Sequence, residues 1–236
     1  MLGLLSYDEG RTVELERTQL LGMPVLQVHA SSGGRWAKYR LGRAARLLTR
    51  RGVRRVLVPR SFGCWALLER RGLAGVNPLP LYRAMADRLV LAMLERIGVD
   101  PQCACVALRG ESVDADLVRT AHMLCPRVRS VTVEAARGGE RLMQELYWEF
   151  GAVAASQTAD AAVRFGGAAQ EGELVLCGRV PNLLGLGLEV PELELPGEMQ
   201  PLPLLTALWQ AGRLGLEEIH VRDETLEVFA SPNKIP

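Results

Sequence analysis

The fold class is indicated first by residues 103–134, which read CACVALRGESVDADLVRTAHMLCPRVRSVTVE. The apolar run Cys103–Leu108 predicts a buried strand, and the spacing of apolar residues over Asp114–Leu124 predicts a helix. A second run rich in β-branched residues follows at Ser130–Glu134. Strand, helix and strand in this order predict a right-handed crossover between parallel strands.

The same alternation extends on both sides of this stretch. Before it we expect strands and helices, in order, at Pro24–His29, Arg35–Arg51, Val53–Val58, Ser61–Arg71 and Leu81–Ile97. After it we expect a helix and then three strand-like runs, at Glu140–Phe150, Ala152–Ala155, Ala161–Phe165 and Leu174–Cys177. Strands alternating with helices predict an α/β protein with a mostly parallel, doubly wound, Rossmann-like sheet.

Both ends of the chain are expected to form hairpins. Leu2–Tyr7 and Thr12–Glu16 flank the polar turn Asp8–Gly10, and a helix at Leu204–Arg213 precedes a second hairpin at Glu218–Phe229. The sequence therefore predicts three segments: a smaller, basic α/β lobe at residues 1–78, the Rossmann-like domain at 79–190, and a proline-rich connection, helix and hairpin at 191–236.

Composition limits the classes of protein to which the chain can belong. Of 236 residues, 48% are hydrophobic and 23% are charged, enough to bury a sizeable core. No stretch approaches the roughly 18 apolar residues of a membrane span, and no signal segment opens the chain, so a cytoplasmic protein that does not enter the membrane is expected.

Charge is divided unevenly along the chain. Residues 1–110 hold 18 Lys or Arg against 8 Asp or Glu, whereas residues 111–236 hold 10 against 19, although the net charge is only +1. A net charge near zero removes the usual global attraction to nucleic acid, so nucleic acid is not expected as a partner. The opposite charges of the halves instead favour self-association, as a homo-oligomer, or an acidic partner.

The cysteine pattern argues against disulfides and against a metal site. The five cysteines are an odd number without a CxxC pair, which predicts reduced and mostly buried thiols. Cys103 and Cys105 have no histidine near them in sequence, and two sulfurs do not complete the usual four ligands of zinc. No metal site is therefore expected.

Residues 103–167 resemble the nucleotide-binding half of NAD(P)-dependent dehydrogenases of the shikimate dehydrogenase type. The resemblance consists of the apolar strand, the helix, the second strand ending in Val131–Glu134, a further helix and the segment Thr158–Val163. It implies NAD(P) as a cofactor, with Glu134 on the ribose hydroxyls, Gly110 in the phosphate loop and Asp160 at the third strand.

One feature of these dehydrogenases is incomplete. The phosphate loop Gly-x-Gly-x-x-Gly corresponds here to residues 109–114, RGESVD, which keep a single glycine. Glu111, Asp114 and Asp116 also place negative charge where a phosphate binds. A Rossmann-like scaffold without the cofactor is therefore the alternative to a dinucleotide site.

A second candidate site is the loop between the strand ending at His29 and the next helix. Its five residues combine hydroxyls, flexible glycines and a cation, as an anion site requires: Ser31, Ser32, Gly33, Gly34 and Arg35. This hypothesis implies a small anionic ligand, with His29 at the edge of the site as an acid or base. The alternatives are an ordinary βα turn and a hydrogen-bonded structural histidine.

The helix predicted at Arg35–Arg51 carries a third candidate site. Its apolar residues lie on one face, and the opposite face carries arginines and two aromatic residues: Arg40, Arg43, Arg46, Arg50, Trp36 and Tyr39. Arginines with interleaved aromatics are typical of surfaces that bind nucleic acid or acidic partners. The alternative is a solvated helix face.

Cys64 is a further candidate, as a reactive thiol. It precedes a helix start, and Cys64 and Arg70 have the spacing of the Cys-x5-Arg loop of tyrosine phosphatases. The intervening residues form a good apolar helix rather than a flexible loop, so Cys64 is interpreted as a packed core cysteine.

The sequence leaves two hypotheses of function open. The chain either binds a small anionic ligand or a nucleotide, or it is a non-catalytic interaction or self-associating protein.

Overall fold

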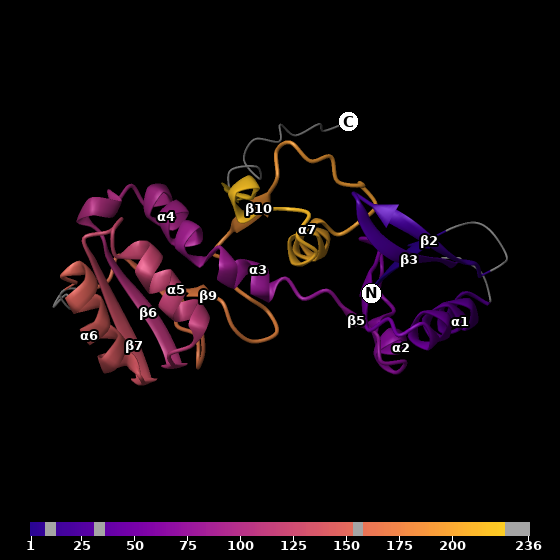
Figure 1. Cartoon of the computed structure of the whole chain (residues 1–236), viewed down its shortest axis with the longest axis horizontal. Coiled ribbons are helices and arrows are strands. Elements are labelled where there is room, and N and C mark those ends of the chain that lie inside the picture. The colour runs from indigo at the N-terminus through magenta and orange to yellow at the C-terminus, as the bar shows by residue number, and fades with distance from the viewer. Residues whose placement is uncertain (8–12, 31–35, 153–157, 225–236) are drawn as a thin grey trace, which may run out of the picture. The chain divides into compact units, whose positions relative to one another are not determined.

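The computed structural model describes residues 1–7, 13–30, 36–152 and 158–224. It is a mixed α/β structure with two mostly parallel sheets, which confirms the predicted fold class. The chain divides into two compact units, unit 1 with Met1–Pro78 and Pro191–Glu218, and unit 2 with Leu79–Val190 and Ile219–Pro236 (Figure 1). Residues 191–236 thus contribute to both units.

Unit 1 is built on a five-stranded sheet with the order β2-β3-β1-β4-β5. The strands are β1 (Leu2–Tyr7), β2 (Leu15–Leu20), β3 (Met23–Ala30), β4 (Arg55–Leu57) and β5 (Ala74–Gly75). The central strand β1 is parallel to both β3 and β4, and β2 is antiparallel to β3. Strand β5 is parallel to β4, so the carboxyl ends of four parallel strands lie at one edge of this sheet.

The expected hairpin between Leu2–Tyr7 and Thr12–Glu16 is wrong. The hairpin joins β2 and β3 instead, with Leu20 paired to Met23 across a two-residue turn. Leu21 (φ 49°) and Gly22 (φ 75°) both adopt the left-handed conformation that a type I′ turn requires. A leucine in that conformation is uncommon, which is why the sequence did not indicate a turn here.

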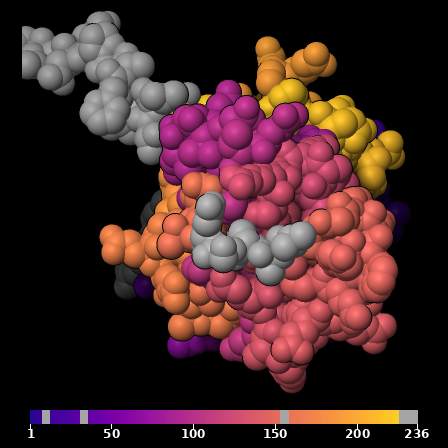
Figure 2. All heavy atoms as spheres, turned by 90° about the vertical axis from the view of Figure 1, so that its left-hand side faces the viewer, coloured from indigo at the N-terminus to yellow at the C-terminus, as the bar shows by residue number. Residues whose placement is uncertain are grey.

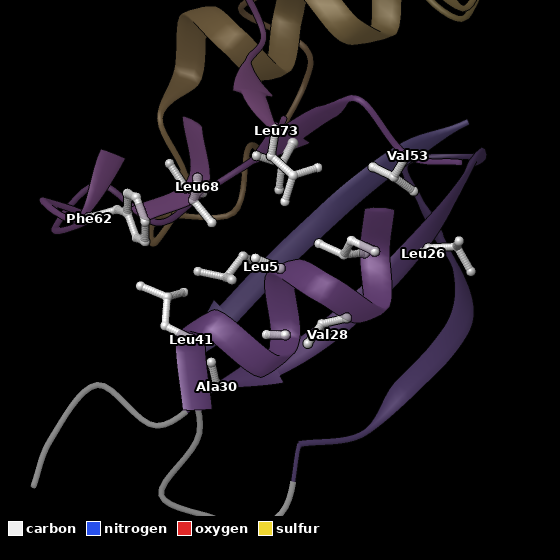
Figure 3. Packing of buried hydrophobic residues seen from close by; sticks show 14 residues of the cluster. Leu5, Leu26, Val28, Ala30, Leu41, Val53, Phe62, Leu68 and Leu73 are labelled. Atoms are coloured by element: carbon white, nitrogen blue, oxygen red, sulfur yellow. The ribbon is translucent and has the colours of Figure 1, made fainter. Parts of the chain in front are cut away.

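One face of this sheet packs against α1 (Ala37–Arg50) and α2 (Trp65–Glu69). Figure 3 shows the core between them, where Leu5 and Val28 of the sheet meet Leu41 of α1 and Leu68 of α2. Unit 1 also contains α7 (Pro201–Gln210) and the 3-10 turn Leu216–Glu218. The segment before α7 is attached to the residues that follow β4, because the Arg60 amide donates to the Glu198 carbonyl at 2.8 Å.

Unit 2 contains a fully parallel four-stranded sheet with the order β7-β6-β8-β9. Its strands are β6 (Cys105–Ser112), β7 (Ser130–Arg137), β8 (Ala161–Arg164) and β9 (Leu174–Val175). Its helices are α3 (Leu79–Ala84), α4 (Ala86–Arg96), α5 (Ala115–Leu124) and α6 (Gly139–Phe150), with a 3-10 turn at Pro101–Cys103. Helix α6 covers one face of the sheet and α5 the other (Figure 1).

Several predicted elements differ in extent or pairing. The helix expected at Leu81–Ile97 is divided into α3 and α4 at Met85, and the helix expected at Ser61–Arg71 keeps only Trp65–Glu69. The strand of the expected C-terminal hairpin, β11 (His220–Asp223), pairs with β10 (Leu186–Glu189), while residues 225–236 lie outside the described residues. Within the described part of the chain, no helix has the length and apolar character to cross a membrane.

Candidate functional site

The carboxyl edge of the sheet in unit 2 is a candidate site. The chain passes from β6 to β7 on one side and then returns to β8 on the other side of β6. In open α/β sheets, ligands bind at the carboxyl ends of the strands where the order reverses in this way. Arg109, Glu134 and Arg164 stand at those ends, on β6, β7 and β8.

These residues form an ion-pair network that we call the edge network: Arg109, Glu134, Arg164 and Glu173. Arg109 Nε donates to Glu134 Oε2 at 2.8 Å, and Arg109 Nη1 donates to Glu173 Oε1 at 2.5 Å. Arg164 donates to both oxygens of Glu173, from Nε at 2.5 Å and from Nη2 at 2.9 Å. The network therefore satisfies its own charges.

Glu173 is the centre of the edge network. Its side chain is only 2% exposed, and its carboxylate also accepts a bond from the Gln170 amide at 3.0 Å. Hydrogen bonds from Arg164, then from Arg109 and Gln170, lower the pKa of Glu173 to about 2, although burial alone would raise it. Glu173 is thus a charged anchor between two arginines.

The expected phosphate loop is not a loop. Strand β6 continues through Gly110 to Ser112, which pairs with Arg137. The helix start that follows is already capped, because Asp114 Oδ1 accepts from the Leu117 amide at 2.9 Å. The amide that would bind a phosphate therefore has an internal partner.

Arg83 also binds the residues at the start of α5. Its Nη1 donates to Asp114 Oδ2 at 2.9 Å, and its Nη2 and Nε donate to the carbonyls of Phe165 and Leu176. Arg83 therefore joins the residues after β8 and β9 to the start of α5, and sequence analysis gave no indication of this role.

The three residues implied as cofactor ligands do not form one site. Gly110 and Glu134 lie at the carboxyl edge, in the strand and in the edge network respectively. Asp160 lies at the opposite edge, where its Oδ2 accepts from the Cys105 amide at 2.8 Å. Since Glu134 is engaged by Arg109 and the α5 start by Asp114, the residues present do not fit a dinucleotide in the Rossmann pose.

The loop Ser31–Arg35, the second predicted site, lies outside the described residues. His29, predicted at its edge, is held on the sheet. Its Nδ1 lies 3.0 Å from Ser6 Oγ, and its Nε2 lies 3.3 Å from Glu16 Oε1. These contacts match the interpretation of His29 as a hydrogen-bonded structural residue.

The cysteines are less buried than expected. Cys64 and Cys103 are exposed, and Cys105 is the buried one. The interpretation of Cys64 as a packed core residue is therefore wrong, because Cys64 is exposed and lies just before the start of α2. Among the described residues, no group of three or more His, Cys, Asp or Glu side chains is placed to hold a metal ion.

The basic face of α1 is arranged differently from the edge network. Leu41, Ala44, Ala45 and Leu48 are buried, as the helical spacing predicts. Trp36 and Tyr39 are 62% and 65% exposed, and their rings meet edge to face with centroids 6.3 Å apart. Two adjacent aromatic rings that are exposed do not serve core packing, so this part of α1 is a candidate recognition surface.

Beside these rings lies a hollow of about 210 Å³, which we call the basic hollow. Its charged residues are Lys38, Arg43 and Arg46 of α1 and Arg71 beyond α2, and the remainder are Tyr39, Gly42 and Leu67. None of the four cationic side chains forms a hydrogen bond or an ion pair with another residue in the described part of the chain. Four like charges thus converge, and no acidic side chain of the described residues is paired with them.

Gly42 forms the floor of the basic hollow. A glycine in a helix interior costs about 1 kcal/mol relative to alanine. A Cβ at Gly42 would have no neighbour within 4 Å, so packing does not require a glycine here. Its effect is to leave open the space between the cationic side chains.

Sequence analysis identified the basic face but missed the hollow. The helical spacing indicates Arg43, Arg46 and Tyr39, but it does not indicate Lys38, Gly42 or Arg71. A glycine within the helical pattern was the available signal for Gly42. Arg71 had none, because only the packing of α1 against α2 brings it to α1.

No protein-family model matches the sequence, and no curated protein is significantly similar to it. Among solved structures, the chain is similar to an L-tryptophan dehydrogenase from Nostoc punctiforme, at 14% identity and a TM-score of 0.26. The similarity covers 61% of this chain and 42% of that protein. At this level it adds nothing to the Rossmann-like strand order seen in unit 2.

Proposed function

We propose that this chain is a binding protein for a nucleotide-like anion, with the phosphate in the basic hollow and the planar ring over Tyr39 and Trp36. The observation that carries the proposal is the convergence of Lys38, Arg43, Arg46 and Arg71, none of which has an acidic partner among the described residues. Arginine forks match phosphate oxygens in pairs, and exposed aromatic rings stack on bases.

The size of the basic hollow supports a phosphate group rather than a whole nucleotide inside it. About 210 Å³ is below the usual range of small-molecule pockets, which begins near 300 Å³. Tyr39 belongs to the hollow and also contacts Trp36, so a ring attached to the phosphate has an aromatic surface beside it.

Titration calorimetry with ATP at low salt tests this function. We expect binding that weakens with added salt, with pyrophosphate retaining part of the affinity and adenosine none at the same concentration. Arg46→Gln should weaken binding about tenfold, whereas Arg17→Gln, an exposed arginine of β2, is the matched control. Equal affinity of both variants for ATP would contradict the proposal.

NAD(P) does not belong to the proposed function. The resemblance to shikimate-type dehydrogenases implied it, but Glu134 and the α5 start have internal partners. Thermal-shift measurements with NAD and NADP at millimolar concentration check this directly, and the Arg43→Gln/Arg46→Gln double variant separates any stabilisation at the basic hollow from stabilisation in unit 2.

Self-association is a second candidate function, favoured by one observation. Tyr147 and Trp148 on the outer side of α6 are 52% and 76% exposed, with ring centroids 5.5 Å apart. Figure 2 shows α6 in salmon on the face of unit 2 turned toward the viewer. Light scattering of the natural chain and of Trp148→Ala tests it, and a monomer at every protein concentration would reject it.

A further inference from the structure

A second hollow, of about 410 Å³, lies in unit 1 and shares no lining residue with the basic hollow. It is formed where β1, β3 and β4 begin, at Leu2, Met23 and Arg55, together with the last turn of α7. Because these strands are parallel, the hollow lies at the amino edge of the sheet, opposite the edge at which β3 ends with His29 and Ala30. Its volume falls within the usual range of small-molecule pockets, about 300–1,000 Å³.

The interior of this amino-edge hollow is apolar. Met23, Val76 and Ala207 are nearly buried and supply its walls, and Leu2 and Pro24 extend them. Such walls offer no partner to a hydrated or doubly charged group, whereas they favour a hydrocarbon chain or ring.

The polar side chains that line the amino-edge hollow are those of Arg55, Gln210 and Arg213. Arg55 Nη1 donates to Gln210 Oε1 at 2.6 Å, so the amide oxygen is engaged and the amide NH₂ is left to donate. Arg213 adds a second guanidinium, and no acidic residue occurs among the described residues that line the hollow. Apart from the bond between Arg55 and Gln210, no side-chain acceptor is recorded for these groups among the described residues that line the hollow.

From this combination we infer that the amino-edge hollow binds a small monocarboxylate with an apolar body, its carboxylate between Arg55 and Arg213 and its chain or ring against Met23 and Val76. A carboxylate has two acceptor oxygens in one plane, which suits a guanidinium fork and an adjacent amide. One negative charge is balanced without placing a polar group on the apolar walls. This site is independent of the basic hollow.

Titration calorimetry with octanoate, below its micellar concentration, tests this inference. Octan-1-ol is the matched probe that keeps the chain and removes the charge. We expect octanoate to bind and octan-1-ol to bind at least tenfold more weakly, since the alcohol leaves the guanidinium groups without an anionic acceptor.

Two variants examine the rim and the interior separately. Arg213→Gln removes one exposed guanidinium and should weaken octanoate binding about tenfold, while Ala211→Trp should block the hollow and abolish binding. Both residues are exposed, so the fold is expected to tolerate the changes. Arg17→Gln and the Arg43→Gln/Arg46→Gln double variant are controls, and both should bind octanoate as the natural chain does.

Three results would overturn the inference: no octanoate binding at millimolar concentration, equal binding of octanoate and octan-1-ol, or unchanged binding by Arg213→Gln and Ala211→Trp. Because the ATP measurements use other residues, a failure here leaves the proposed function standing, and a failure of ATP binding leaves this site standing.

Discussion

The edge network of unit 2 and the basic hollow of unit 1 use the same side chain in opposite ways. In the edge network, Arg109 and Arg164 share one nearly buried carboxylate, Glu173. In the basic hollow, Arg43 and Arg46 are exposed near Lys38 and Arg71, and none of these side chains is paired with an acid of the described residues. The position of the acids, rather than the abundance of arginine, thus separates a structural charge cluster from a candidate binding site.

The largest effect is expected when the edge network loses its centre. Glu173→Ala leaves Arg109 and Arg164 largely buried without their carboxylate, which should lower the free energy of unfolding by about 3–5 kcal/mol. Urea denaturation measures it. Glu134→Ala is the matched control, because its side chain is 53% exposed and its loss should cost about 1 kcal/mol or less. Similar losses for the two variants would contradict the central role of Glu173.

A pH dependence of stability should follow from the same carboxylate. Its pKa is lowered to about 2 in the folded protein from an ordinary value of 4.5. The stabilisation is therefore present above pH 4.5 and is lost as the pH falls from about 4.5 toward 2, by an amount on the order of 3 kcal/mol. Denaturation of the natural chain and of Glu173→Gln across this range measures it. If both lose stability equally, the assignment to Glu173 is wrong.

In the basic hollow the expected effect is on binding rather than on folding. The Arg43→Gln/Arg46→Gln double variant should lose about 100-fold in ATP affinity, because two charge-assisted contacts are removed. Its free energy of unfolding should change by less than about 0.5 kcal/mol, because both side chains are exposed and unpaired in the described structure. A large loss of stability would show that these arginines are structural after all.

The smallest effect is expected at the floor of the basic hollow, where stability and binding should move in opposite directions. Gly42→Ala should raise the free energy of unfolding by up to about 1 kcal/mol, since a Cβ there meets nothing. The added methyl group lies between the cations and should weaken ATP binding a few-fold. Tighter or unchanged binding together with higher stability would remove the argument that Gly42 serves the hollow.

Elements whose signal is local could be predicted from the sequence, whereas long-range pairings could not. The apolar face of α1 and the alternation β6, α5, β7 follow from local periodicity, and the structure confirms them. The pairing of β2 with β3 could not be foreseen, because it depends on a leucine in a left-handed turn. The division of the expected helix at Met85 likewise has no local signal such as an internal glycine or proline.

By itself the sequence determined the α/β class, the strand–helix alternation and the basic face of α1, because each is encoded in the spacing of nearby residues. Only the tertiary structure decided that Arg109 engages Glu134 and Glu173, which lie 25 and 64 residues further along the chain. Contacts between residues so distant in sequence depend on the order of the strands, which periodicity does not specify. For the same reason, the sequence did not predict that the residues implied as a cofactor site take part in an ion-pair network. Nor did it predict that Arg71 lies at the basic hollow.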